Sequence, residues 1–225
     1  MIEILYLDKN IAVINKPAGT PSQSDPSGDP DAMTLTSDAL RARGEDGGLF
    51  LVHRLDRGVG GILAFARHKR VAAELSLAVS ERRITKEYLA VTKGIPEEGV
   101  YTDYLFKDGA SNKSYAVKTA RKGSKLAELS LVLVSSASRD GRTLSLVKVR
   151  LGTGRHHQIR AQLSSRGTPL VGDKKYGGGD INAQGISLFA SRLAFSLFGK
   201  EYSFKASPDY EKYPWNLFVD EVKTI

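Results

Sequence analysis

The chain has 225 residues, of which 41% are hydrophobic and 26% charged, as in a globular protein with a proper core. It contains no cysteine, which excludes disulfide bonds and thiolate metal sites, and no apolar run is long enough to cross a bilayer as a helix. A formal net charge of +8 favours polyanionic partners, of which nucleic acids are the most common.

The first part of the chain predicts short strands and two helices joined by glycine- and proline-rich loops. Apolar side chains at helical spacing, among them Val71 and Leu75, indicate the second helix. Thr34 or Thr36 is expected to begin the first helix, and Gly44 to close it. In order, we expect strands at 2–7 and 11–15, a loop at 16–31, a helix at 35–43, strands at 50–53 and 61–66, and a helix at 69–81.

The second part of the chain predicts a meandering, largely antiparallel sheet, because strand-like runs follow one another with short breaks. A helix is expected to begin near Thr153 as its cap and to end before Gly167. We expect strands at 86–92, 100–106, 114–119, 126–135, 143–151, 186–198 and 202–206, and a closing helix or irregular segment at 209–220. The sequence thus predicts an α+β fold with a mixed, mainly antiparallel sheet, formed as a single domain over 1–225.

The stretch 52–61 places one carboxylate, Asp56, between Arg54 and Arg57 on a glycine-rich loop with apolar flanks. Neighbouring positive charges keep a carboxylate ionised, which suits a nucleophile or a base. The alternative is an ordinary structural ion pair of Asp56 with Arg54 or Arg57.

Other polar residues admit both a functional and a structural interpretation. His156 and His157 together with His53 suggest a metal site, although adjacent helix residues point to different faces. A helix N-terminus beside Arg155 and His157 is suited to one RNA phosphate. Taken singly, Tyr88 is an ordinary half-buried strand tyrosine.

Five segments in order make the chain resemble the RluA family of pseudouridine synthases. The central one, His53-Arg54-Leu55-Asp56, is the family signature. The other four are the strand and Asn-Lys-Pro-Ala-Gly at 13–19, Lys86-Glu87-Tyr88, the Thr-Gly-Arg-x-His-Gln-Ile-Arg run at 153–160, and Gly-Asp-x-x-Tyr-Gly at 172–177. The chain departs from the family at Val59 and Gly60, where Thr and Ser are usual, and at His156, where Thr is usual.

The resemblance implies isomerisation of uridine to pseudouridine in RNA without any cofactor. Asp56 would be the essential residue, and it would either attack C1′ or remove the C2′ proton. Arg160 would be its ion-pair partner, and Tyr88 would stack on the uracil. The residues expected to bind substrate are His53, Arg54, Leu55, Lys16, Arg155, His157, Gln158 and Ile159: Arg54 to hold the flipped nucleotide, Ile159 to pack beneath the base, and Lys16, Arg155 and His157 to bind backbone phosphate.

The expected partner is a structured RNA, either rRNA or tRNA, with no membrane, metal or obligate protein partner. We expect a cytoplasmic location, since the N-terminus lacks an export signal. We also expect a monomer and no separate N-terminal RNA-binding module. Two other functions remain open. One is a non-catalytic RNA-binding or RNA-folding protein on the same scaffold. The other is a metal-assisted hydrolase that uses His53, Asp56 and the His156-His157 pair.

Overall fold

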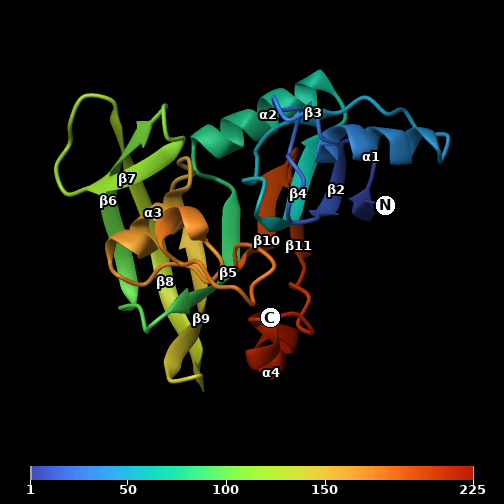
Figure 1. The fold of residues 1–225 in the computed structure, drawn as a ribbon. Helices are drawn as coiled ribbons and strands as arrows, with labels where there is room; N and C mark the ends of the chain where they lie inside the picture. Colours follow the sequence, from blue (N-terminus) through green and yellow to red (C-terminus); the bar gives the residue numbers. More distant parts are fainter. Residues whose placement is uncertain (1, 225) are drawn as a thin grey trace. The chain divides into compact units, whose positions relative to one another are not determined.

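The computed structural model describes residues 2–224 and contains both helices and strands, which confirms the predicted α+β class (Figure 1). In chain order the elements are β1 (Glu3–Leu7), β2 (Ile11–Lys16), α1 (Ala32–Arg41), β3 (Phe50–Leu51), β4 (Gly60–Ala66), α2 (Lys69–Ser80), β5 (Thr85–Lys93), β6 (Gly99–Asp108), β7 (Lys113–Val117), β8 (Ser124–Arg139), β9 (Arg142–Leu151), α3 (Gln158–Ser165), the 3-10 turn η1 (Lys174–Tyr176), β10 (Leu188–Leu197), β11 (Lys200–Lys205), the 3-10 turn η2 (Trp215–Leu217) and α4 (Val219–Thr224).

The chain divides into two compact units. The first comprises residues up to Lys86 together with Ala190–Ala206, and the second comprises Glu87–Phe189 and the residues from Ser207 onward. Each unit contains its own hydrophobic core and its own part of the predicted site. The expectation of a single catalytic domain stays a prediction from the sequence.

In the first unit, the strands follow the order β1-β2-β4-β10-β11, with the short β3 also paired to β4. The pairs β1–β2, β2–β4, β3–β4 and β10–β11 are antiparallel. Helix α2 packs against β3 and β4 and buries Val71, Leu75 and Ala78 in a core that includes Ile11, Ile62 and Phe195. The apolar spacing that predicted this helix is therefore the face that it buries.

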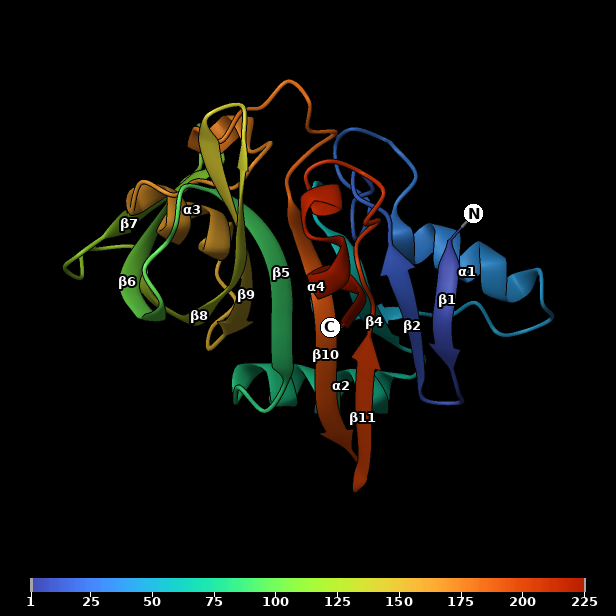
Figure 2. The same cartoon turned by 90° about the horizontal axis from the view of Figure 1, so that it is seen from below.

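In the second unit, the strands follow the order β5-β9-β8-β6-β7, and their pairings are antiparallel. The antiparallel pairing agrees with the prediction, but the predicted meander is wrong, because β5 pairs with β9 and β6 pairs with β8 rather than each strand with the next in sequence. The strands β6 to β9 curve around α3, which contacts β6 and β7 (Figure 2). A helix on the concave face of a twisted sheet is fixed along its whole length, so it can hold a side chain in a defined position.

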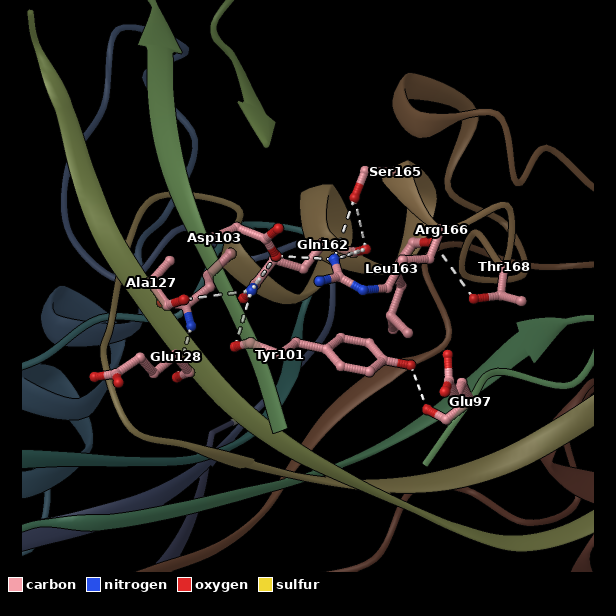
Figure 3. A network of polar contacts seen from close by, with 11 residues as sticks. Glu97, Tyr101, Asp103, Ala127, Glu128, Gln162, Leu163, Ser165, Arg166 and Thr168 are labelled. Atoms are coloured by element: carbon pink, nitrogen blue, oxygen red, sulfur yellow. Dashed lines mark hydrogen bonds and ion pairs between the residues drawn. The ribbon is translucent and has the colours of Figure 1, made fainter. Parts of the chain in front are cut away.

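Buried polar side chains anchor α3 to the sheet (Figure 3). The Nε2 of Gln162, which is 0% exposed, donates to the Asp103 carboxylate at 2.7 Å and to the Tyr101 carbonyl at 3.3 Å. Arg166 donates to the same carboxylate at 2.8 Å, and its guanidinium lies 4.1 Å from the Tyr101 ring centroid. Because Asp103 accepts from both ends of the last helical turn, α3 has little freedom to rotate on the sheet.

Two helix boundaries differ from prediction because the caps are not the residues expected. Helix α1 begins at Ala32, and its cap is Asp31, whose side chain accepts from the Thr34 N–H at 3.0 Å. Helix α3 begins at Gln158 after His157, which has a left-handed backbone with φ of 52°. The predicted cap of α3, Thr153, instead donates to the side chain of Gln158 at 2.8 Å.

Gly61, at the start of β4, is required by a close approach to β10. Its φ is +114°, a conformation that L-residues rarely adopt, and a Cβ there would lie 2.4 Å from the Ala190 carbonyl oxygen. The neighbouring Val59 is buried at 2% exposure. Part of the turn in which the chain departs from its apparent relatives therefore belongs to the apolar core rather than to the surface.

We expect Gly61→Ala to lower the free energy of unfolding by about 3 kcal/mol or more, since backbone strain and overlap with Ala190 act together. Gly109→Ala is the matched control, because a Cβ there meets nothing within 4 Å. It should change stability by no more than about 0.5 kcal/mol in urea denaturation. Equal losses in the two variants would contradict the close-approach explanation.

Candidate active site

Asp56 lies half-buried on the loop between β3 and β4, and the backbone on both sides of it is fixed by hydrogen bonds. The Leu55 N–H donates to the Ser22 hydroxyl at 3.0 Å, and that hydroxyl donates to the Leu55 carbonyl at 2.8 Å. The Val59 N–H donates to the Asp56 carbonyl at 2.9 Å and closes a turn. The expected substrate residue Leu55 is itself 5% exposed, so it anchors the loop.

Lys16 is fully buried at the end of β2, and its ammonium is bound by backbone carbonyls. Its Nζ donates to the carbonyls of Thr20 at 2.7 Å, Pro17 at 3.0 Å and Arg57 at 3.3 Å. Burial lowers the pKa of Lys16 to about 8, and attraction to Asp56 opposes the shift. The expected contact of Lys16 with RNA phosphate stays a prediction. In this structure the ammonium is enclosed and donates to three carbonyls.

The two arginines that flank Asp56 differ in what they contact. Arg57 donates to the Gly19 carbonyl at 3.0 Å and to the Ser27 hydroxyl at 2.9 Å, and forms an ion pair with Asp29. Arg57 thus serves the loop before α1. This supports the sequence inference that Arg57 is not the main partner of the carboxylate. Arg54 is exposed, which is compatible with its expected contact to a nucleotide.

His53 is a neutral imidazole that supports the start of β4. Its Nε2 accepts from the Ala64 N–H at 3.2 Å. Burial, with a smaller contribution from the positive charge of Lys86, lowers the pKa of His53 to about 3. His53 thus has a structural contact through one ring nitrogen, and its substrate-binding role stays a prediction.

In the second unit, Arg160 of α3 forms a buried ion pair with Asp173. Arg160 Nε lies 2.7 Å from Asp173 Oδ2 and Nη2 lies 2.9 Å from Oδ1, and the two residues are 6% and 0% exposed. A two-point contact fixes the plane of the guanidinium. The sequence analysis places Asp173 in a motif but predicts no role for it. The Gly-Asp-x-x-Tyr-Gly motif was the available signal for it.

Tyr176, from the same motif, connects three segments that lie close to Arg160. Its hydroxyl accepts from the Ser114 N–H of β7 at 2.7 Å and is hydrogen-bonded to His157 Nδ1 at 3.1 Å. Its ring centroid lies 5.0 Å from the Arg160 guanidinium carbon. His156 stacks on His157 with centroids 3.8 Å apart and is hydrogen-bonded to the Ser114 hydroxyl at 2.9 Å. The two histidines thus belong to a packed network.

His157 is expected from this network to remain neutral. Burial, followed by the positive charge of Arg160, lowers its pKa to about 2. A neutral His157 would bind a phosphate only as a neutral hydrogen-bond donor, and its expected contact with RNA phosphate stays a prediction. Its left-handed backbone positions the ring toward Tyr176 just before α3 begins.

Gln158 closes the loop that precedes α3, and both of its amide heavy atoms are hydrogen-bonded there. Its Oε1 accepts from the Thr153 hydroxyl at 2.8 Å and the Arg155 N–H at 3.0 Å, while its Nε2 donates to the Glu128 carbonyl at 2.9 Å. Gln158 is 3% exposed and holds its own loop in place, and its substrate-binding role stays a prediction. Arg155 donates to the Leu126 carbonyl at 2.8 Å through Nε and is half-buried.

Tyr88 and Ile159 are both largely buried, at 7% and 4% exposure. Tyr88 lies on β5 opposite Val149 of β9, on a defined face of the sheet as the strand pattern indicates. Tyr88 and Arg160 belong to the second unit, and Asp56 belongs to the first. The joint action of these three residues stays a prediction from the resemblance.

Among residues 2–224, no group of three or more His, Asp or Glu side chains is arranged to hold a metal ion. The Nδ1 atoms of His156 and His157 are hydrogen-bonded to the hydroxyls of Ser114 and Tyr176. No helix in the same range is long and apolar enough to cross a membrane.

Comparison with known proteins identifies sequence relatives over most of the chain. The family described as RNA pseudouridylate synthase matches residues 10–165. The Ribosomal large subunit pseudouridine synthase C of Rickettsia bellii is 34% identical over 92% of this chain and 69% of its own length. The Uncharacterized RNA pseudouridine synthase YhcT of Bacillus subtilis is 30% identical over 82% of this chain. The match spans 61% of the length of that relative.

Two solved human structures share the fold. Human RNA Pseudouridylate Synthase Domain Containing 1 is 26% identical, has a TM-score of 0.75, and is matched over 93% of this chain and 84% of its own. Human RNA Pseudouridylate Synthase Domain Containing 4 has a TM-score of 0.77 at 21% identity, over 98% of this chain and 93% of its own. At the latter identity the likeness concerns the fold alone.

We expect Asp173→Asn to lower the free energy of unfolding by about 3–5 kcal/mol, because it leaves the buried Arg160 guanidinium without its counter-ion. Asp38→Asn is the matched control, since Asp38 forms an exposed ion pair with Arg41 at 3.1 Å. The control should cost about 0–1 kcal/mol in the same urea titration. Comparable losses would show that Asp173 is not the main counter-ion of Arg160.

His157 should make the protein more sensitive to acid. Its folded pKa of about 2 lies below the ordinary 6.5, so below pH 6.5 the unfolded chain gains a proton that the native chain does not. Stability is then lost progressively as the pH falls from about 6.5 toward 2. His157→Asn keeps a residue that tolerates the left-handed backbone and removes the titration. Between pH 7 and pH 4 the wild type should lose more unfolding free energy than the variant. Parallel curves would contradict this.

Proposed function

Since the chain belongs to the RNA pseudouridylate synthase family, we propose that it isomerises uridine to pseudouridine in a structured RNA. The names of its relatives include a Ribosomal large subunit pseudouridine synthase C and, at 32% identity in Haemophilus ducreyi, a tRNA pseudouridine synthase C. The substrate class proposed for this chain is RNA, which the names of both relatives have in common. The expectations of a monomer and of a cytoplasmic location stay predictions.

The observation that carries the proposal is the fixed loop that bears Asp56. Ser22 holds the residue before Asp56, Lys16 and the Gly19 N–H hold the carbonyl of the residue after it, and Lys16 supplies a nearby positive charge. A carboxylate on a loop with a fixed backbone is positioned before substrate arrives, and this preorganisation is a major source of rate acceleration.

The proposed reaction is redox-neutral. The bond between uracil N1 and ribose C1′ breaks, the uracil turns over, and a bond forms between C5 and C1′. The proton on C5 is released to solvent, and N1 takes up a proton. Asp56, as the ionised carboxylate, either attacks C1′ or removes the C2′ proton so that a glycal forms. No other reactant is consumed.

The remaining roles follow from the resemblance and from what each side chain contacts. Tyr88 is proposed to stack on the uracil, and Arg160 is proposed as the counter-ion of Asp56, with its guanidinium plane set by Asp173. Arg54, which is exposed, is proposed to hold the nucleotide that leaves its stack. Ile159 is proposed to pack beneath the base.

We expect wild-type protein to release tritium to water from cellular RNA labelled at uracil C5, because the reaction must remove that hydrogen. Asp56→Asn should release none, while it keeps the side-chain size and binds the same RNA. Arg57→Gln is the matched control. It removes a charge next to Asp56 that the structure assigns to the loop before α1, so tritium release should persist.

Retention of RNA binding by Asp56→Asn, measured by filter binding, separates loss of chemistry from loss of binding. Equal tritium release from wild type and Asp56→Asn would reject Asp56 as the reacting group. No release from either, with RNA binding intact, would favour the non-catalytic RNA-binding alternative.

A further inference from the structure

The end of the β10–β11 hairpin has a backbone that its sequence does not favour. The pair Leu197 and Lys200 closes a two-residue turn formed by Phe198 and Gly199, whose φ angles are 51° and 79°. A turn with two positive φ angles is the type that suits a two-residue hairpin, and its first position strongly prefers Asn, Asp or Gly. A bulky aromatic residue in that position is unusual.

The same chain builds a second turn of this kind with the preferred residues. At the end of the β8–β9 hairpin, the pair Arg139 and Arg142 encloses Asp140 and Gly141, with φ angles of 51° and 71°. The two turns have nearly the same backbone. Phe198 is therefore not needed to make the turn, and an observed backbone outlier of this kind indicates a role other than folding.

The Phe198 ring is not part of the core of its unit. Its neighbour Leu197 is 2% exposed and belongs to the core, whereas Phe198 is 52% exposed. The Arg70 guanidinium of α2 lies 5.0 Å from the ring centroid, and this is an exposed contact. An exposed cation–π contact returns little stability, so it does not account for a bulky residue held in the left-handed region.

The surroundings of this ring are basic. Helix α2 begins with Lys69 and Arg70, has no acidic residue in its first turn, and is preceded by His68. These three residues are exposed. The nearest acidic residue along the helix, Glu74, is paired with Arg83 at 3.6 Å. The end of the β10–β11 hairpin projects past α2 (Figure 2). The exposed Phe198 ring lies next to the Arg70 guanidinium of this helix.

We propose that the end of the β10–β11 hairpin is a second RNA contact, in which Phe198 stacks on an unpaired base while Lys69 and Arg70 bind the adjacent phosphates. Aromatic faces beside cations are the usual means of holding unpaired nucleotides. The proposal rests on RNA being the substrate. It concerns a part of the RNA other than the target uridine, because the seven residues of β4 separate Asp56 from α2 by roughly 20 Å at about 3.3 Å per residue.

The test uses Phe198→Asn, which removes the ring and places the preferred residue in the turn. Binding is measured by fluorescence anisotropy with a uridine-free, unpaired 20-nucleotide RNA, so that no turnover is involved. The affinity should fall about five- to tenfold, at the lower end of the effect of losing one base–aromatic stack. The thermal midpoint should stay equal or rise, because Asn-Gly favours this turn. Phe198→Trp, which restores a stacking face, should bind like wild type.

Tyr210→Asn is the matched control. Tyr210 is also an exposed aromatic residue, with the Lys223 ammonium 4.8 Å from its ring centroid, but it stands between Asp209 and Glu211. Its affinity for the same RNA should remain within about twofold of wild type, because flanking carboxylates repel phosphate. Arg70→Gln should reduce the slope of log affinity against log salt by about one.

Unchanged affinity in Phe198→Asn would overturn the proposal, as would a fall in thermal midpoint without a change in affinity, since the ring would then be structural. If Phe198→Asn does not fold, an unchanged salt slope in Arg70→Gln overturns it instead. Tritium release by the wild type reports separately on the proposed reaction. A failure of the hairpin contact therefore leaves the isomerase proposal intact, and the reverse also holds.

Discussion

The Asp56 loop depends on one buried ammonium. Lys16 occupies the end of β2, and its three hydrogen bonds reach the loop that follows β2 and the carbonyl next to Asp56. Loss of this side chain would remove a donor from each of three carbonyls. The Arg57 carbonyl would keep the Gly19 N–H and the Pro17 carbonyl the Thr20 N–H, whereas the Thr20 carbonyl would lose its bond to Lys16, which is costly. Burial also lowers the pKa of Lys16 to about 8, because it disfavours the charged ammonium that donates to these carbonyls. Attraction to Asp56 offsets part of that cost. The positive charge of Lys16 and the negative charge of Asp56 therefore stabilise each other.

Much of the fold could be predicted because apolar periodicity is a local signal. The antiparallel pairing of the second unit was expected from its strand-like runs, and α2 from the spacing of Val71 and Leu75. The strand order was not, since β5 pairs with β9 and β6 with β8. Helix starts were predicted less well. Asp31 caps α1 from inside a segment that reads as irregular loop, and α3 begins only after the left-handed His157. Hydrophobic spacing does not predict the backbone conformation of one histidine, and it does not show which of several candidate residues caps a helix.

The candidate site shows a different limit, which concerns polar residues in the core. Lysine and glutamine are usually exposed, so Lys16 and Gln158 were assigned to RNA, whereas the structure buries both among backbone groups. Most of their partners are backbone groups, which are present at every residue and so cannot be predicted from residue type. Asp173 and Tyr176 show a different limit. Their motif was visible, but a role for Asp173 requires knowing that η1 lies beside α3, and only the folded chain brings them together.

The two buried cations are held in different ways, and this difference bears on what each can do. Lys16 is bound by neutral carbonyls, so it retains a net positive charge and acts on Asp56 through that charge. Arg160 is neutralised by Asp173, which contacts Nε and Nη2. A guanidinium has five donors in one plane, so it can serve a second carboxylate while the first fixes its orientation. A lysine in the place of Arg160 would lack that geometry, which explains why an arginine paired with an aspartate suits the role proposed for this position.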